Sequence, residues 1–206
     1  MAALLLAGTV SGCAGQSPRT AAGGPLNVSP LVKKAGAVHG DAGPCPISYD
    51  IGQAAKRIGV SGQAGPEQGK GTVSSESDKT AGPGSPLADA GGAVVSCAFG
   101  IAADKITVYT VGTRRPDYAL GLMAPQIASD AQMASSAMQK WLPTAQKAKR
   151  GTATVTPSGN VGAVRLSVDG AGDIALVVIE GKDGRTHIGA DKMKTLTETL
   201  AAQADW

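Results

Sequence analysis

The chain has 206 residues, which is enough for one ordinary domain with tails but too few for two full domains. Apolar residues make up 42% of it and aromatic residues only 3%, so we expect a core of aliphatic and small side chains. A formal net charge of +3 is too small for a nucleic-acid-binding protein, whose basic residues must dominate one face to neutralise phosphates. Nucleic acid is therefore excluded as an expected partner.

The chain opens with a short apolar leader, MAALLLAGTVSGC, in which one branched and two small residues precede Cys13. This pattern resembles the lipobox of bacterial lipoprotein signals, whose cysteine thiol takes up a diacylglyceryl group. We predict that residues 1–12 are a signal peptide and that lipidated Cys13 anchors the mature chain to the outer face of the cell membrane. Export signals begin with basic residues and the first here is Arg19, so we expect translation to start upstream of Met1. A buried N-terminal helix and a chance match remain alternatives.

After the cysteine, residues 14–44 contain ten Gly or Pro residues among 31 and few large apolar ones. Such a segment buries too little surface to offset its ordering entropy, so residues 13–44 are expected to form a disordered tether. A single domain is predicted over residues 45–206. It begins with a short helix that Asp50 caps and Gly59 ends, and residues 60–92 are expected to be a mobile loop.

Strand patterns follow this loop. Residues 93–102 and 105–113 are rich in β-branched side chains and predict a hairpin with its turn at Asp104 and Lys105. Residues 116–149 then show helical periodicity that Pro143 is expected to break.

The last part of the domain predicts three strands and a closing helix. The strands are expected over residues 151–157, 161–170 and 173–181, and the third is apolar on both faces, as in a central strand. Alternation in the second strand predicts that Arg165 points to solvent. A short returning strand is expected through His187, followed by a helix with Met193, Leu196 and Leu200 on one face. These elements predict an α+β fold, a mostly antiparallel sheet of about five strands with helices packed on it.

Two cysteines remain once Cys13 is lipidated. In an exported chain, Cys45 and Cys97 are most simply explained as one disulfide across the low-complexity loop. The alternative, a metal pair, lacks CxxC spacing and has only His39 and His187 to complete it.

A lipobox, a Ser/Gly/Pro tether, a cysteine before a short helix, a long loop and a Cys-x-aromatic strand together resemble a family of uncharacterised actinobacterial cell-envelope lipoproteins. That family usually has a Cys-x-Trp strand, whereas this chain has Cys97, Ala98 and Phe99. The resemblance implies location and fold, and it implies no catalytic residues.

The sequence shows no catalytic constellation. GxSxG and SxxK motifs are absent, and GAGDIA at Gly170 is followed by a strand pattern where a phosphate-binding loop needs a helix. His187 has no evident orienting partner. The acidic residues are scattered singly: Asp117, Asp130, Asp169, Asp173 and Glu180. We expect a protein that is not an enzyme and that has no cofactor and no metal.

The one regional bias is basic, with eight Lys or Arg residues against three acidic ones between Asp104 and Arg165. Candidate anion-binding residues for lipid headgroups or wall polymers are Arg114, Arg115, Lys147, Lys149 and Arg150. The alternative is an ordinary solvated helix surface.

These observations favour a lipid-anchored surface protein with a non-enzymatic binding or accessory domain. Its expected partner is an anionic envelope component or an envelope protein. The alternatives are an envelope enzyme or enzyme regulator acting on wall polymers, and a purely structural wall-associated protein.

Overall fold

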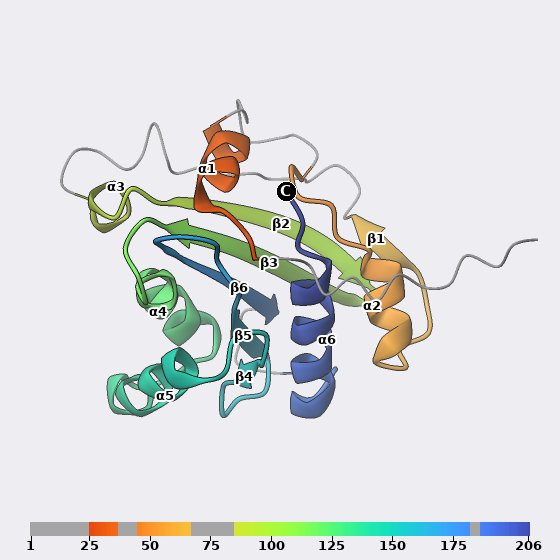
Figure 1. Ribbon diagram of the computed structural model, residues 1–206. Coiled ribbons are helices and arrows are strands. Elements are labelled where there is room, and N and C mark those ends of the chain that lie inside the picture. Colours follow the sequence, from red (N-terminus) through yellow and green to blue (C-terminus); the bar gives the residue numbers. More distant parts are fainter. Residues whose placement is uncertain (1–24, 37–44, 67–84, 182–185) are drawn as a thin grey trace, which may run out of the picture.

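The computed structural model describes residues 25–36, 45–66, 85–181 and 186–206. Within these ranges the chain forms an antiparallel sheet with helices packed on it, which confirms the α+β class, with one strand more than expected. The helices are α1 (Val28–Gly36), α2 (Ile51–Arg57), α3 (Pro86–Asp89), α4 (Ala119–Asp130), α5 (Ser135–Lys147) and α6 (Ala190–Gln203). The strands are β1 (Ala64–Pro66), β2 (Ala93–Ile101), β3 (Asp104–Thr113), β4 (Thr154–Val155), β5 (Val161–Arg165) and β6 (Asp173–Glu180), in the spatial order β1-β2-β3-β6-β5-β4 (Figure 1).

Helices cover both faces of the sheet (Figure 1). Helices α1, α2 and α6 pack on one face and form the larger hydrophobic cluster, while α4 and α5 cover the other face over β3, β6 and β5. Strand β6 lies between β3 and β5, and all eight of its residues are buried. The prediction of a central strand covered on both sides is therefore confirmed.

The N-terminal part of the predicted domain folds as its local signals indicate. The Asp50 carboxylate accepts a hydrogen bond from the backbone N–H of Gln53 at 2.8 Å and caps α2. Gly59 follows the helix with φ of +67°, a conformation that glycine adopts without strain. Helix α6 likewise presents Met193, Leu196 and Leu200, all fully buried, to the sheet.

The hairpin of β2 and β3 is confirmed, but its turn lies two residues earlier than expected. Ile101 pairs with Asp104, so the turn consists of Ala102 and Ala103, and Ala102 adopts a φ of +54°. Asp104 is therefore the first residue of β3, with Lys105 next to it in the strand.

The folded region begins well before Cys45, which corrects the predicted tether over residues 25–36. Leu26 forms a parallel bridge with Val168, and α1 follows it at once. Val28, Leu31 and Ala35 are spaced i, i+3 and i+7 and are buried against the sheet, Leu31 completely. Burial of the apolar stripe of α1 thus stabilises an ordered helix, although the sequence around it is rich in Gly and Pro.

The predicted loop over residues 60–92 also contains ordered elements at both ends. Residues 64–66 add β1 to the edge of β2, and Ser85 caps α3 by accepting a hydrogen bond from the backbone N–H of Ala88. Residues 67–84 lie outside the described part of the chain.

The predicted helical region divides at a different place from the one expected. Pro143 lies inside α5 on its exposed side, where water can bond to the carbonyl that proline leaves without a partner. The break falls after α4, where Gln132 adopts a φ of +51°. The N–H of Met133 then bonds to Ala128 O and that of Gln132 to Ser129 O, which is a Schellman ending with glutamine in the usual glycine position.

Helix α6 approaches β5 closely at Gly162. A Cβ atom added to this glycine would lie 2.1 Å from Thr197 Oγ1 and 3.1 Å from Thr197 Cβ. The absence of a side chain at Gly162 thus sets the distance between the closing helix and the sheet.

Candidate functional site

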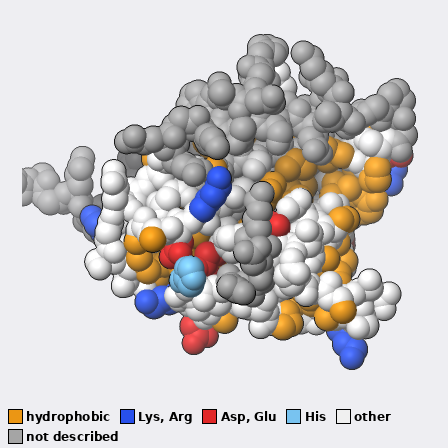
Figure 2. Space-filling view, turned by 180° about the vertical axis from the view of Figure 1, so that it is seen from behind, with side chains coloured by type: hydrophobic (Ala, Val, Ile, Leu, Met, Phe, Trp, Pro, Cys, Tyr) orange, Lys and Arg blue, Asp and Glu red, His pale blue; other side chains and the backbone are white. Residues whose placement is uncertain are grey.

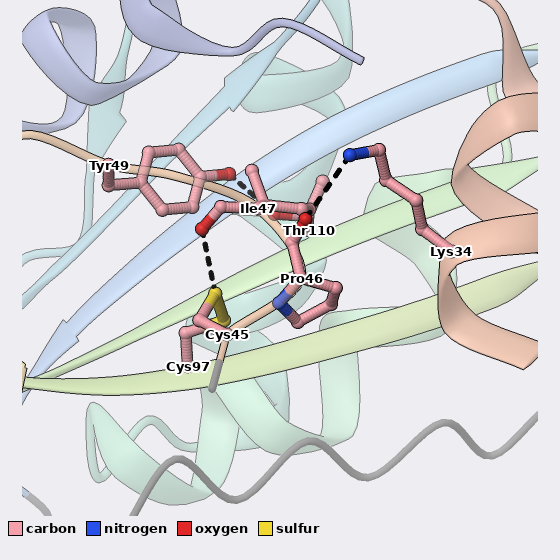
Figure 3. Close-up of a disulfide and its surroundings, with 7 residues drawn as sticks. All are labelled: Lys34, Cys45, Pro46, Ile47, Tyr49, Cys97 and Thr110. Atoms are coloured by element: carbon pink, nitrogen blue, oxygen red, sulfur yellow. Dashed lines mark hydrogen bonds between the residues drawn. A yellow bond between two sulfur atoms is a disulfide. The ribbon is translucent and has the colours of Figure 1, made fainter. Parts of the chain in front are cut away.

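The predicted disulfide between Cys45 and Cys97 is present, with 5.6 Å between the two Cα atoms. Cys97 lies in the middle of β2 and is 1% exposed, while Cys45 precedes α2 (Figure 3). The bond joins positions 52 residues apart, so it closes the segment that contains β1 and α3 onto the sheet. Cys45 Sγ also lies 2.9 Å from Ile47 O, but a bridged sulfur has no proton, so this contact adds no hydrogen bond.

A partly buried tyrosine lies near the disulfide, with its hydroxyl directed into the protein (Figure 3). The Tyr49 hydroxyl lies 2.7 Å from Thr110 Oγ1, and its ring meets Phe99 edge to face with 6.2 Å between centroids. Burial raises the pKa of Tyr49 far above its ordinary value, and the hydrogen bond to Thr110 only partly opposes this. Lys34 of α1 donates to Pro46 O at 3.3 Å, so α1 is tied to the same segment.

The five candidate anion-binding residues belong to two segments. Arg114 and Arg115 directly follow β3 and are exposed, and Arg115 lies 5.7 Å from the centre of the Tyr118 ring. Lys147 ends α5 and is exposed, as is Lys149, while Arg150 is half-buried. We refer to Arg114, Arg115, Lys147, Lys149 and Arg150 as the basic corner.

Arg165 connects the two segments of the basic corner, and this corrects the prediction that it points to solvent. It is 8% exposed, because α5 covers the second face of β5. Its guanidinium donates to Gln146 O at 2.6 Å, pairs with Asp117, and donates to Asp173 Oδ1 at 3.1 Å. The ends of β3 and α5 therefore meet at this one side chain.

Asp173 is the fully buried carboxylate at the centre of this network. Its Oδ2 accepts the backbone N–H of Ala119 at 3.0 Å, at the start of α4. Its Oδ1 accepts from Arg165, and Arg150 Nη1 lies 3.5 Å away. Arg150 also donates to Leu166 O. These bonds hold Arg150 in place, whereas Arg114, Arg115 and the two lysines have exposed cationic groups that can contact carboxylates or phosphates.

His187 lies outside any strand, which corrects the predicted returning strand. Its exposed imidazole has a partner that the sequence did not indicate, because Nδ1 lies 2.7 Å from Asp104 Oδ1. In Figure 2 the histidine (pale blue) lies at the surface beside acidic side chains (red). The hydrogen bond to Asp104 and its negative charge raise the pKa of His187, with a smaller contribution from Glu180.

Several predicted residues lie outside the described part of the chain, namely Cys13, the leader over residues 1–12, and His39. In the described ranges no helix has both the length and the apolar character required to cross a membrane. Comparison with protein-family models, with curated proteins and with solved structures finds no match.

Proposed function

We propose that this chain is an exported bacterial lipoprotein, anchored to the outer face of the cell membrane through Cys13. The observation that carries the proposal is the disulfide between Cys45 and Cys97. Structural disulfides persist in oxidising, extracytoplasmic compartments and are rare in the cytosol. The leader that ends in VSGC supplies the matching export signal and a thiol for lipidation. Acyl chains on that cysteine would hold the folded domain at the bilayer surface.

The folded domain acts, in this proposal, as a non-enzymatic binding or accessory module for an anionic envelope component. Support comes from the basic corner, where Arg165 and Asp173 bring two cationic segments together. The cationic side chains there, Arg165 included, number six against the carboxylates of Asp117 and Asp173. Guanidinium groups recognise phosphate and carboxylate through paired hydrogen bonds, so a phosphate-bearing lipid headgroup or wall polymer fits this surface.

Binding is tested with the full-length chain carrying Cys13→Ser, which keeps it soluble. It is mixed with phosphatidylglycerol vesicles, phosphatidylcholine vesicles or polyphosphate, and binding is followed by co-sedimentation and by thermal shift. We expect salt-sensitive binding to at least one anionic probe and none to phosphatidylcholine. The vesicle and polyphosphate arms distinguish a lipid headgroup from a phosphate polymer.

The matched comparison removes four exposed cations from the basic corner. This variant should no longer bind. Its four substitutions are Arg114→Gln, Arg115→Gln, Lys147→Gln and Lys149→Gln. The control replaces the four exposed cations of α2 and α6 with Gln and should retain binding; these are Lys56, Arg57, Lys192 and Lys194. Equal loss in both variants, or no binding of the parent chain to either anionic probe, would contradict a binding role for the basic corner.

An envelope enzyme or enzyme regulator is the second candidate function. The observation that favours it is the exposed imidazole of His187 beside the carboxylate of Asp104. A carboxylate that orients a histidine is a common arrangement in acid–base catalysis. Hydrolysis of a wall polymer by the parent chain, lost in His187→Gln, would support this candidate over the binding module.

A further inference from the structure

Two carboxylates and one imidazole come together at the end of the sheet opposite the basic corner. Asp104 is the first residue of β3 and Glu180 is the last residue of β6. Ile106 is the Cα partner of Glu180, and Asp104 lies two residues before it on the same face of the sheet. The two side chains are therefore diagonal neighbours across adjacent strands.

The segment that carries His187 is fixed in place by the Glu180 carboxylate, which is 3% exposed as a residue. Its Oε1 accepts the backbone N–H groups of His187 at 2.6 Å and Ile188 at 3.1 Å, and its Oε2 accepts the Thr186 hydroxyl at 2.6 Å. Thr186 Oγ1 accepts in turn the N–H of Gly189 at 2.7 Å. Because the backbone is held on both sides of His187, its imidazole is directed onto Asp104.

One ligand atom from each of Asp104, Glu180 and His187 lies within 4.8 Å of the other two. We propose that these three side chains form a binding site for a divalent transition-metal ion, with Zn²⁺ the best fit. Zn²⁺ is bound at about 2.0 to 2.2 Å by imidazole nitrogen and carboxylate oxygen, so tetrahedral ligands lie about 3.4 Å apart. The ligand atoms, which lie within 4.8 Å of one another, can therefore reach this spacing through small side-chain movements.

The donor set and the exposure of the site favour zinc over the alkaline-earth ions. Ca²⁺ takes six to eight oxygen ligands and Mg²⁺ keeps several waters, whereas an imidazole nitrogen with two carboxylates suits a borderline-soft ion. The His187 side chain is 78% exposed and that of Asp104 18%, so solvent can reach the cluster. Three protein ligands leave the fourth tetrahedral position open for water, as in catalytic zinc sites. Structural zinc sites, in contrast, have four protein ligands.

Metal binding replaces the direct contact between His187 and Asp104. Nδ1 and Oδ1 are 2.7 Å apart and share a proton in the metal-free protein. The ion takes that place, the proton between Nδ1 and Oδ1 passes to solvent, and the neutral imidazole carries its one proton on the exposed Nε2. The imidazole turns away by several tenths of an ångström. Glu180 keeps its two backbone hydrogen bonds, which both go to Oε1. Among the described residues its Oε2 accepts only the Thr186 hydroxyl, so this oxygen has a second lone pair for a metal.

The test is Zn²⁺ binding to the full-length chain carrying Cys13→Ser, since a free thiol at residue 13 would itself bind zinc. After removal of metals with a chelator, Zn²⁺ is titrated by calorimetry, and Co²⁺ is used as a second probe through its visible absorption. We expect one high-affinity ion per chain. The affinity should fall at least about tenfold in His187→Gln and in Asp104→Asn.

The matched control is His39→Gln, which removes the other histidine of the chain and should leave the affinity unchanged. Both site variants change exposed or partly exposed side chains and keep the backbone N–H of His187 that bonds to Glu180, so circular dichroism should show the parent fold. Undiminished Zn²⁺ affinity in both site variants, or no binding by the parent chain, would overturn the proposal. Since neither site variant alters the basic corner, anion binding is tested separately from metal binding.

Discussion

The disulfide offers the most quantitative prediction. Replacement of Cys45 and Cys97 by alanine, in the chain that carries Cys13→Ser, removes a crosslink between positions 52 residues apart. Closing a loop of that length lowers the entropy of the unfolded chain and stabilises the folded state by about 4 kcal/mol. In a domain of this size, about 2 to 4 °C of melting temperature correspond to each kcal/mol, so melting should fall by about 8 to 16 °C.

The assay is guanidinium and thermal unfolding of the two proteins, each with and without reductant. Reductant should destabilise the crosslinked parent to the level of the double alanine variant and should not affect that variant. The crosslinked parent carries only Cys13→Ser. As a control it is compared with the oxidised wild-type chain, and the two should be equally stable. A loss below about 1 kcal/mol on removal of the bond would refute the reasoning that closing the chain between Cys45 and Cys97 stabilises the folded state.

Three further predictions concern packing, charge and pH. Gly162→Ala should destabilise the domain by about 1 to 3 kcal/mol in denaturant unfolding, because the added methyl group overlaps α6, whereas Gly65→Ala, with open space around it, should have little effect. Asp173→Ala should cost at least about 3 kcal/mol in the same assay, since it leaves the buried Arg165 guanidinium without its buried partner; near-wild-type stability would contradict this. The raised pKa of Tyr49 means that above about pH 10 only the unfolded state releases this proton, so stability should fall with rising pH by up to about 1.4 kcal/mol per unit. Melting curves at pH 9 and 11 should show a smaller alkaline loss in Tyr49→Phe, and an equal loss would count against burial of the phenol.

Elements with strong local signals could be predicted from the sequence. The cap at Asp50, the β-branched run around Cys97 and the doubly apolar β6 each act within a few residues, and the structure confirms all three. Helix α1 also had such a signal in the spacing of Val28 and Leu31, but composition taken over a long Gly- and Pro-rich stretch concealed it.

Features that depend on distant parts of the chain were not predictable in this way. Strand alternation indicates that Arg165 lies opposite the core, but only the packing of α5 shows that this second face is also buried. The pairing of Asp104 with His187 joins residues 83 positions apart, and no spacing in the sequence relates them. The end of α4 could not be predicted because no glycine marks it in the sequence. Gln132 takes the left-handed conformation that glycine usually adopts at this position.

The central claim is that the protein reaches the cell surface as a lipid-anchored, oxidised domain. It is tested most directly by intact-mass spectrometry of the membrane fraction from a lipoprotein-processing bacterial host that expresses the full-length chain. We predict a chain that begins at Cys13, carries a diacylglyceryl group on that sulfur, and is two hydrogens lighter than the reduced form because Cys45 and Cys97 are joined. An unmodified chain that retains Met1 and has three free thiols, recovered from the cytosol, would contradict the account.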